Sequence, residues 1–140
     1  MEFSSQEIER INENSLYRSL GIRVDTITGG KARSSLRPNP AHCWPFEGRP
    51  HGGVLFTLMD TTMAWAVLSG VDQEMGCATI NMDIQYIRRA DDPVLFCDTW
   101  VTHQGGRMVY TRGNIIDEAD QLLATGQGVF RLVKRPPEGV

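Results

Sequence analysis

Hydrophobic residues are most concentrated between residues 52 and 68, where their spacing predicts a helix. Its apolar positions, which fall on nearly every side, are Val54, Leu55, Phe56, Leu58, Met59, Met63, Ala64, Trp65, Ala66, Val67 and Leu68. A helix that is apolar all round is expected to be buried. Gly70 ends it. Asp60 and three threonines interrupt the apolar run, so it does not predict a membrane span.

The residues before this segment predict a helix and a β-hairpin. Ser4 and Glu7 have the spacing of a capping box, at the start of a helix that ends near Gly21. Two extended segments follow, residues 22–28 and 31–36, and the glycine pair between them is typical of a hairpin turn.

Residues 37–50 carry four prolines and predict a long loop. After residue 72 the pattern is that of strands, at residues 77–87, 94–103, 107–117 and 122–133. In the first of them, apolar and polar residues alternate with a period of two. The turns between the last three are short enough only for antiparallel neighbours, so we expect a four-stranded meander.

Together these elements predict an α+β fold in which a strongly curved antiparallel sheet wraps around the central helix, with a further helix at the N-terminus. The 140 residues are the length of one domain. We expect residues 134–140 to form a frayed tail. An exposed edge strand, or a helix face that the sheet leaves uncovered, would favour a homodimer.

Composition narrows the classes of function. The formal charge is −3, so no basic field is present to attract nucleic acid or an anionic membrane. The first residues are acidic and polar, unlike a signal peptide. Cys43, Cys77 and Cys97 form no CxxC pair, which indicates free thiols in a reducing cytoplasm.

Asp60 is the only acid between Arg49 and Asp72, and it lies in the middle of the most apolar helix. An uncompensated carboxylate there would be costly, so it must be hydrogen-bonded, paired or neutral. One interpretation is a structural residue bonded to the Thr57 or Thr61 side chain. The other is a general base or nucleophile in a partly dry site.

A second candidate group, His51-Gly52-Gly53, lies where the proline-rich loop enters the helix. The first amides of a helix are donors without partners at the positive end of the dipole, and glycines let a ligand approach the backbone closely. An oxygen that develops negative charge would be stabilised there by the Gly52 amide. Alternatively, His51 is a capping or packing residue at a flexible helix entry.

Helix geometry separates the two candidates. Asp60 lies nine residues after His51, which is half a turn round the helix and roughly 13 Å along its axis. Within one chain these groups cannot act on one reacting bond. If both belong to one site, the helix of a second subunit supplies the other half, and the functional interpretation predicts an obligate dimer with two active sites across the interface.

His51-Gly52-Gly53 followed by Leu58-Met59-Asp60 resembles the HGG-x6-D signature of hotdog-fold acyl-CoA thioesterases, and most of all their phenylacetate-pathway (PaaI-type) branch. Residues 79–86 and 104–107 also fall where that family expects them, and the resemblance covers about residues 20–133. It implies hydrolysis of an acyl-CoA thioester to a free acid and CoA, without a metal or a cofactor, by a homodimer or a dimer of dimers.

The resemblance also implies roles for residues. The Gly52 amide would polarise the thioester carbonyl, with His51 positioning that end and Gly53 beside the substrate. Asp60 from the facing subunit would attack the carbonyl or activate a water. Thr79 would orient the attacking group.

The acyl group and the CoA phosphates require further contacts. Trp44 stands where the family often has an asparagine that helps to hold the carbonyl, and Trp44 and Phe46 would either wall an acyl pocket or only pack the loop. Arg88, Arg89 and Arg107 match basic positions of the family and are candidate phosphate contacts, or are ordinary exposed arginines.

Other functions are weighed against this one. Residues 39–42 resemble part of the motif of hotdog enoyl-CoA hydratases, but Arg37 stands where that chemistry needs an aspartate. A non-catalytic acyl-CoA-binding module would gain by losing Asp60. A hydrolase built on the adjacent His42 and Cys43, or a metal site that adds His51, has no spacing that brings the groups together.

Overall fold

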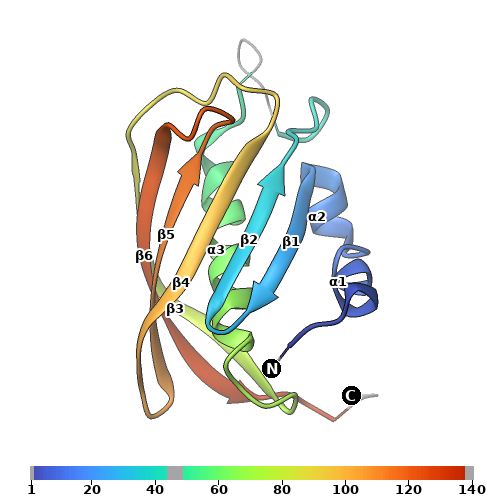
Figure 1. The fold of residues 1–140 in the computed structure, drawn as a ribbon, viewed down its shortest axis with the longest axis vertical. Helices are drawn as coiled ribbons and strands as arrows, with labels where there is room; N and C mark the ends of the chain where they lie inside the picture. The colour runs from blue at the N-terminus through green and yellow to red at the C-terminus, as the bar shows by residue number, and fades with distance from the viewer. Residues whose placement is uncertain (1, 44–48, 138–140) are drawn as a thin grey trace.

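A six-stranded antiparallel sheet curves around one long helix (Figure 1). The computed structural model describes residues 2–43 and 49–137. The elements are α1 (Ser5–Ile11), α2 (Ser15–Leu20), β1 (Ile22–Thr28), β2 (Lys31–Leu36), α3 (Gly52–Leu68), β3 (Met75–Tyr86), β4 (Leu95–Gly105), β5 (Met108–Ile116) and β6 (Leu122–Lys134). The strand order is β1-β2-β4-β5-β6-β3. The predicted α+β architecture is therefore confirmed.

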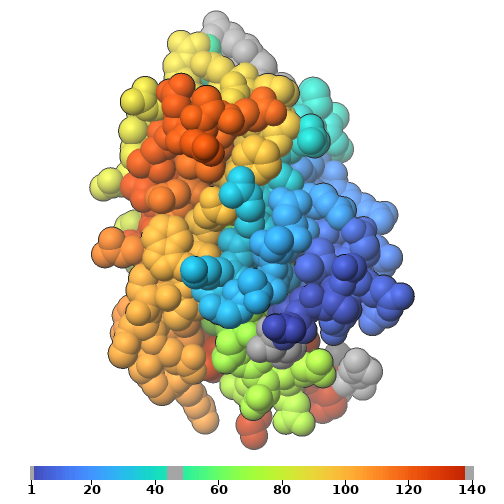
Figure 2. All heavy atoms as spheres, viewed as in Figure 1, coloured from blue at the N-terminus to red at the C-terminus, as the bar shows by residue number. Residues whose placement is uncertain are grey.

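The concave face of the sheet is shaped to hold α3. Met59 and Met63 of the helix are fully buried. A Cβ on Gly113 of β5 would lie 2.5 Å from the Met59 sulfur, and one on Gly128 of β6 would lie 3.0 Å from the Met63 sulfur. Glycines at these positions let the helix lie close to the strands. In the space-filling view, side chains of the sheet cover the helix from this side (Figure 2).

The predicted single N-terminal helix is wrong. The capping box of Ser4 and Glu7 is present, but α1 ends at Ile11 and α2 starts a new helix. Between them, the buried side chain of Asn12 donates to the Val24 carbonyl and accepts from the Val24 amide, both at 2.8 Å. These bonds occupy backbone groups of β1 and hold the chain out of a continuous helix.

The predicted four-stranded meander is also wrong in one respect. Strands β4, β5 and β6 are consecutive neighbours, but β3 pairs with β6, and β4 pairs with β2. The connection over residues 87–94 is too long for a tight hairpin turn. It carries the chain across the sheet, so that β3 forms the edge opposite β1.

A β-bulge at Ile80 breaks the predicted alternation of β3. Thr79 pairs with the buried Phe130 of β6, and after the bulge Tyr86 pairs with the buried Ala124. Both side chains therefore face the helix, whereas strict alternation places them on opposite faces. Bulges of this kind re-aim side chains and are frequent next to active sites.

The two edges of the sheet differ. The β1 edge is covered by α1 and α2 (Figure 1). On the β3 edge, Ile80 is 56% exposed, and Phe56 on the neighbouring α3 is 37% exposed. The predicted complete burial of α3 is thus wrong for one stripe of the helix. No helix in the described part of the chain is long and apolar enough to cross a membrane.

Candidate active site

Asp60 and Thr79 form a hydrogen-bonded pair between α3 and β3. The Thr79 hydroxyl donates to Oδ1 of Asp60 at 2.7 Å. The partners suggested by the sequence, Thr57 and Thr61, are not the ones found, because Thr57 donates instead to the Gly53 carbonyl at 3.0 Å. Asp60 lies on the partly exposed stripe of the helix, so its carboxylate is oriented by Thr79 and still reachable.

The start of α3 presents one backbone donor without a described partner. His51 is the N-cap, and its Nδ1 accepts from the Gly53 amide at 2.9 Å. The His51 carbonyl accepts from the Val54 amide at 2.9 Å. Among the described residues none accepts from the Gly52 amide, which is the position expected of an unsatisfied donor at a helix N-terminus. His51 thus has the capping role that the sequence left open.

Tyr86 also reaches this end of the helix. Its hydroxyl donates to the Gly52 carbonyl at 2.6 Å. Sequence reasoning placed Tyr86 in a strand that matches the family but gave it no role. The signal that could have found it is its place in the alternation, since it shares a face with Met82 and Ile84, which pack against the core.

Within one chain the structure does not bring Asp60 and Gly52 together. Helix α3 is unbroken from Gly52 to Leu68. Eight residues at 1.5 Å each place the two groups roughly 12 Å apart along the axis, far beyond the reach of one reacting carbonyl. A groove of about 420 Å³ lined by Asp83, Trp100 and Arg112 lies on the outer face of the sheet, away from both.

The environments of Cys77 and Cys43 favour the protonated thiol over the nucleophilic thiolate. Burial, with a smaller contribution from the negative charge of Asp60, raises the pKa of Cys77 to about 11. Its thiol therefore stays protonated beside the carboxylate. Cys43 is fully buried, its Sγ donates to the Leu20 carbonyl at 3.0 Å, and burial raises its pKa. This agrees with setting aside a hydrolase built on Cys43 and His42.

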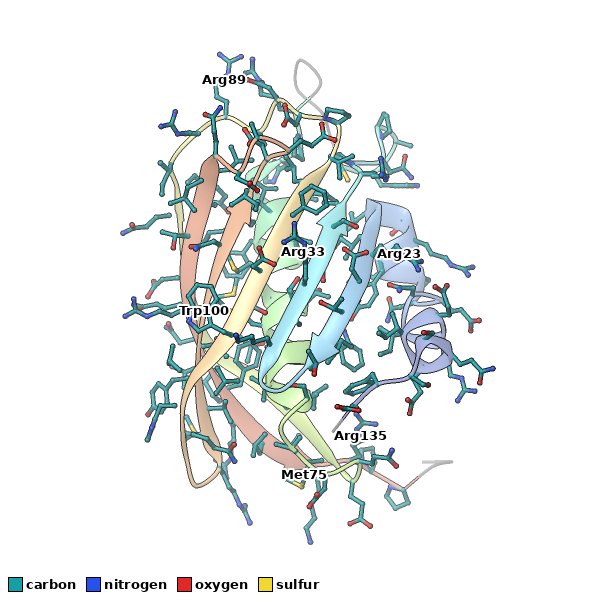
Figure 3. The ribbon with its side chains drawn as sticks, in the orientation of Figure 1. Arg23, Arg33, Met75, Arg89, Trp100 and Arg135 are labelled. Carbon is teal, nitrogen blue, oxygen red and sulfur yellow. The ribbon has the colours of Figure 1, made fainter. Side chains whose placement is uncertain are left out.

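The candidate phosphate contacts lie at two ends of the molecule. Arg88 and Arg89 follow the Tyr86 end of β3, and Arg107 lines a groove with Met75 at the other end. Figure 3 shows Arg89 and Met75 at opposite ends. One chain therefore does not bring all three arginines together.

Two candidate residues of the acyl pocket and the possibility of a metal site remain. Trp44 and Phe46 lie outside the described residues. Across residues 2–43 and 49–137, no group of three His, Cys, Asp or Glu side chains is placed to hold a metal ion.

Comparison with known proteins places this geometry in a family. A family model described as the thioesterase superfamily matches residues 47–124. A conserved protein of Pseudomonas aeruginosa has a solved structure with 31% identity, a TM-score of 0.79, and coverage of 86% of this chain and 94% of that one. A protein of Halobacterium salinarum, named as an esterase, is 27% identical over 134 residues, 89% of this chain and 88% of its own.

Two further solved structures share the fold. A thioesterase of Haemophilus influenzae superposes with a TM-score of 0.87 at 14% identity, covering 100% of this chain and 97% of its own. The PaaI protein of the phenylacetic acid degradation operon of E. coli superposes with a TM-score of 0.79 at 22% identity, covering 91% of each chain.

Proposed function

Because the chain belongs to the thioesterase superfamily, with the hotdog fold of those hydrolases, we propose that it hydrolyses an acyl-CoA thioester to a free acid and CoA. The proposal includes an active site shared between two copies of the chain. The observation that carries it is the pair of complementary groups on one helix: an oriented carboxylate at Asp60 and, roughly 12 Å away, a Gly52 amide from which no described residue accepts.

A twofold dimer would supply the missing half of each site. Four of the seven exposed large hydrophobic side chains in the described ranges lie along or just beyond α3 and β3: Phe56, Ile80, Tyr86 and Ile87. Pairing the open β3 edges antiparallel would bury them and set the two α3 helices side by side in opposite directions. Asp60 of one protomer would then approach Gly52 of its partner.

The chemistry needs few groups. A thioester carbonyl that accepts from the Gly52 amide becomes more electrophilic, and the oxygen is stabilised as it gains negative charge. Asp60 would take a proton from a water that attacks the carbonyl carbon, or attack that carbon itself to give an anhydride that water then opens. In both routes the C–S bond breaks, CoA leaves as the thiolate and takes up a proton, and the acyl group leaves as the acid. No metal or cofactor takes part in the proposed reaction.

The antiparallel dimer also favours CoA as the leaving group. It would bring the Arg107 end of one protomer toward the Arg88 and Arg89 end of its partner, so that cationic side chains from both could meet the phosphates. The similarity to the PaaI protein of the phenylacetic acid degradation operon favours an aromatic acyl group. The free thiols of Cys43, Cys77 and Cys97 support a cytoplasmic setting.

Thiol release from a panel of acyl-CoAs tests the proposal. We expect wild-type protein to release CoA. Asp60→Asn should lower kcat by roughly 100-fold or more while leaving the fold and acyl-CoA binding intact, because it removes the carboxylate that acts as the base or nucleophile. Asp83→Asn, on the outer face of β3, is the matched control and should keep wild-type turnover. Full activity in Asp60→Asn would assign the chemistry to another residue.

A further inference from the structure

Tyr86 lies where one side chain can control the amide that is to bind the substrate. We propose that it is a positioning residue, whose hydroxyl holds the Gly52–Gly53 segment so that the Gly52 amide points at the carbonyl oxygen of the substrate. This inference rests on the proposed thioesterase function and adds to it a residue that does not touch the reacting atoms.

The first support is the number of hydrogen bonds that hold the Gly52–Gly53 segment, whose backbone is otherwise flexible. Two adjacent glycines have more backbone freedom than any other pair of residues. Here the peptide group between them is held at both ends, since its carbonyl accepts from Tyr86 at 2.6 Å and its N–H donates to His51 at 2.9 Å. The preceding peptide is fixed by the bond from Val54 to the His51 carbonyl. Among the described residues these bonds leave the Gly52 amide without an acceptor.

The second support is that the Gly52 carbonyl has no need of a side-chain donor. In the first turn of a helix it is the amides that lack partners, whereas the carbonyls accept from amides one turn later. The Tyr86 hydroxyl therefore adds a bond that the helix does not require. Partial burial raises the pKa of Tyr86, so the hydroxyl keeps its proton and its donor role at neutral pH.

The third support is the bulge at Ile80, which lets the Thr79 and Tyr86 hydroxyls both reach α3 from one strand. Thr79 and Tyr86 are seven residues apart, so in a regular strand they would point to opposite faces. With the bulge both face α3, and the two hydroxyls reach the two groups of the site: Thr79 contacts Asp60, and Tyr86 contacts Gly52. In the proposed dimer Asp60 and Gly52 of one chain belong to two different active sites. Strand β3 therefore positions one group in each of them.

Tyr86→Phe removes the hydroxyl and keeps the ring. We expect kcat to fall about tenfold with KM within about twofold, because alignment of the donor matters most when charge develops on the oxygen. Tyr110→Phe, on the outer face of β5, is the matched control and should behave as wild type. Both variants are assayed at a temperature where circular dichroism shows them folded. A kcat equal to wild type in Tyr86→Phe overturns the inference.

A readout independent of turnover separates this inference from the proposed function. Amide hydrogen exchange at Gly53, followed by NMR, should be at least about tenfold faster in Tyr86→Phe, since the peptide loses one of its two tethers. Unchanged exchange overturns the positioning role, even if the protein hydrolyses thioesters. Failure of wild-type protein to release CoA from any acyl-CoA would instead overturn the proposed function, while faster exchange would still support the tether.

Discussion

At Asp60 a single carboxylate lies between a hydroxyl donor and a protonated thiol. Thr79 fixes one of its oxygens at 2.7 Å, and Cys77 is close enough for the Asp60 charge to contribute to its raised pKa. These neighbours orient the carboxylate and put no second negative charge beside it. The thiol adds packing beside it without competing for the substrate.

The thiols predict how stability changes with pH. Burial raises the pKa of Cys77 to about 11 and that of Cys97 to about 12. The thiol of an unfolded cysteine has a pKa of about 8.5, so above that pH the unfolded chain loses protons that the native chain keeps. The free energy of unfolding should therefore include this contribution in full below about pH 8.5, and lose it as the pH rises toward 11 and beyond.

Urea unfolding at pH 8, 9 and 10 measures this dependence. The decline should be shallower in Cys77→Ala, which removes one of the two groups and keeps a small side chain. Equal slopes in Cys77→Ala and wild type would contradict the assignment to this thiol.

Among the elements, β5 and β6 set how closely the sheet can approach α3. At Gly113 an added Cβ would lie 2.5 Å from the Met59 sulfur and 2.8 Å from the Thr99 methyl group. Because the threonine side chain is branched and buried, it cannot move aside freely. We expect Gly113→Ala to lower the free energy of unfolding by about 1–3 kcal/mol.

Gly70→Ala provides the control for this substitution. Gly70 is exposed just after α3, and its nearest neighbour to an added Cβ is the Val67 carbonyl at 3.8 Å. Denaturant titration should place Gly70→Ala close to wild type. A Gly113→Ala protein as stable as Gly70→Ala would mean that close contact with Gly113 does not set the distance between α3 and β5.

The elements whose sequence signal is local were predicted well. The hairpin at Gly29-Gly30, with φ of 55° and 75°, and the bounds of β1, β2 and α3 follow from turn chemistry and periodicity. The pairing of β3 with β6, and the bulge at Ile80, depend on contacts between distant segments. Neither can be predicted from the alternation of apolar and polar residues in one strand.

In the candidate site too, residues with a local sequence signal could be predicted, and contacts between distant segments could not. Asp60 stands out as a lone acid in an apolar helix, and the Gly52 region by its glycines and helix entry. Local spacing offers Asp60 only the threonines of its own helix as partners. The hydroxyl found beside it belongs to Thr79 on another element, which only the family resemblance names. The alternation places Tyr86 on the same face as Met82 and Ile84, which is the helix face, but its contact with Gly52 depends on how β3 lies along α3, and no local pattern gives that.

For the whole molecule, the difference between the two sheet edges predicts the assembly. Asn12 occupies backbone groups of β1, whereas β3 carries the exposed Ile80. Ile80→Lys should therefore yield a monomer and lower thioester hydrolysis by roughly 100-fold or more, because each site would lose its second half. Sedimentation velocity measures the mass.

Leu16→Lys is the matched control for that variant. Leu16 is 51% exposed on α2, remote from β3, and the substitution should leave both mass and turnover unchanged. An Ile80→Lys monomer with wild-type turnover would place the complete site within one chain.

Complementation between two inactive variants tests the shared site most directly. Asp60→Asn removes the carboxylate, and Gly52→Pro removes the amide donor. Proline is favoured at the first position of a helix, and His51, with φ −57° and ψ 143°, has the backbone that a residue before proline requires.

Refolding the two variants together at equal concentrations should produce mixed dimers in which one site has both wild-type groups. With half of the dimers mixed and one complete site in each, the mixture should recover about a quarter of wild-type turnover. A mixture that forms mixed dimers, yet is no more active than the two variants separately, would contradict a site shared between protomers.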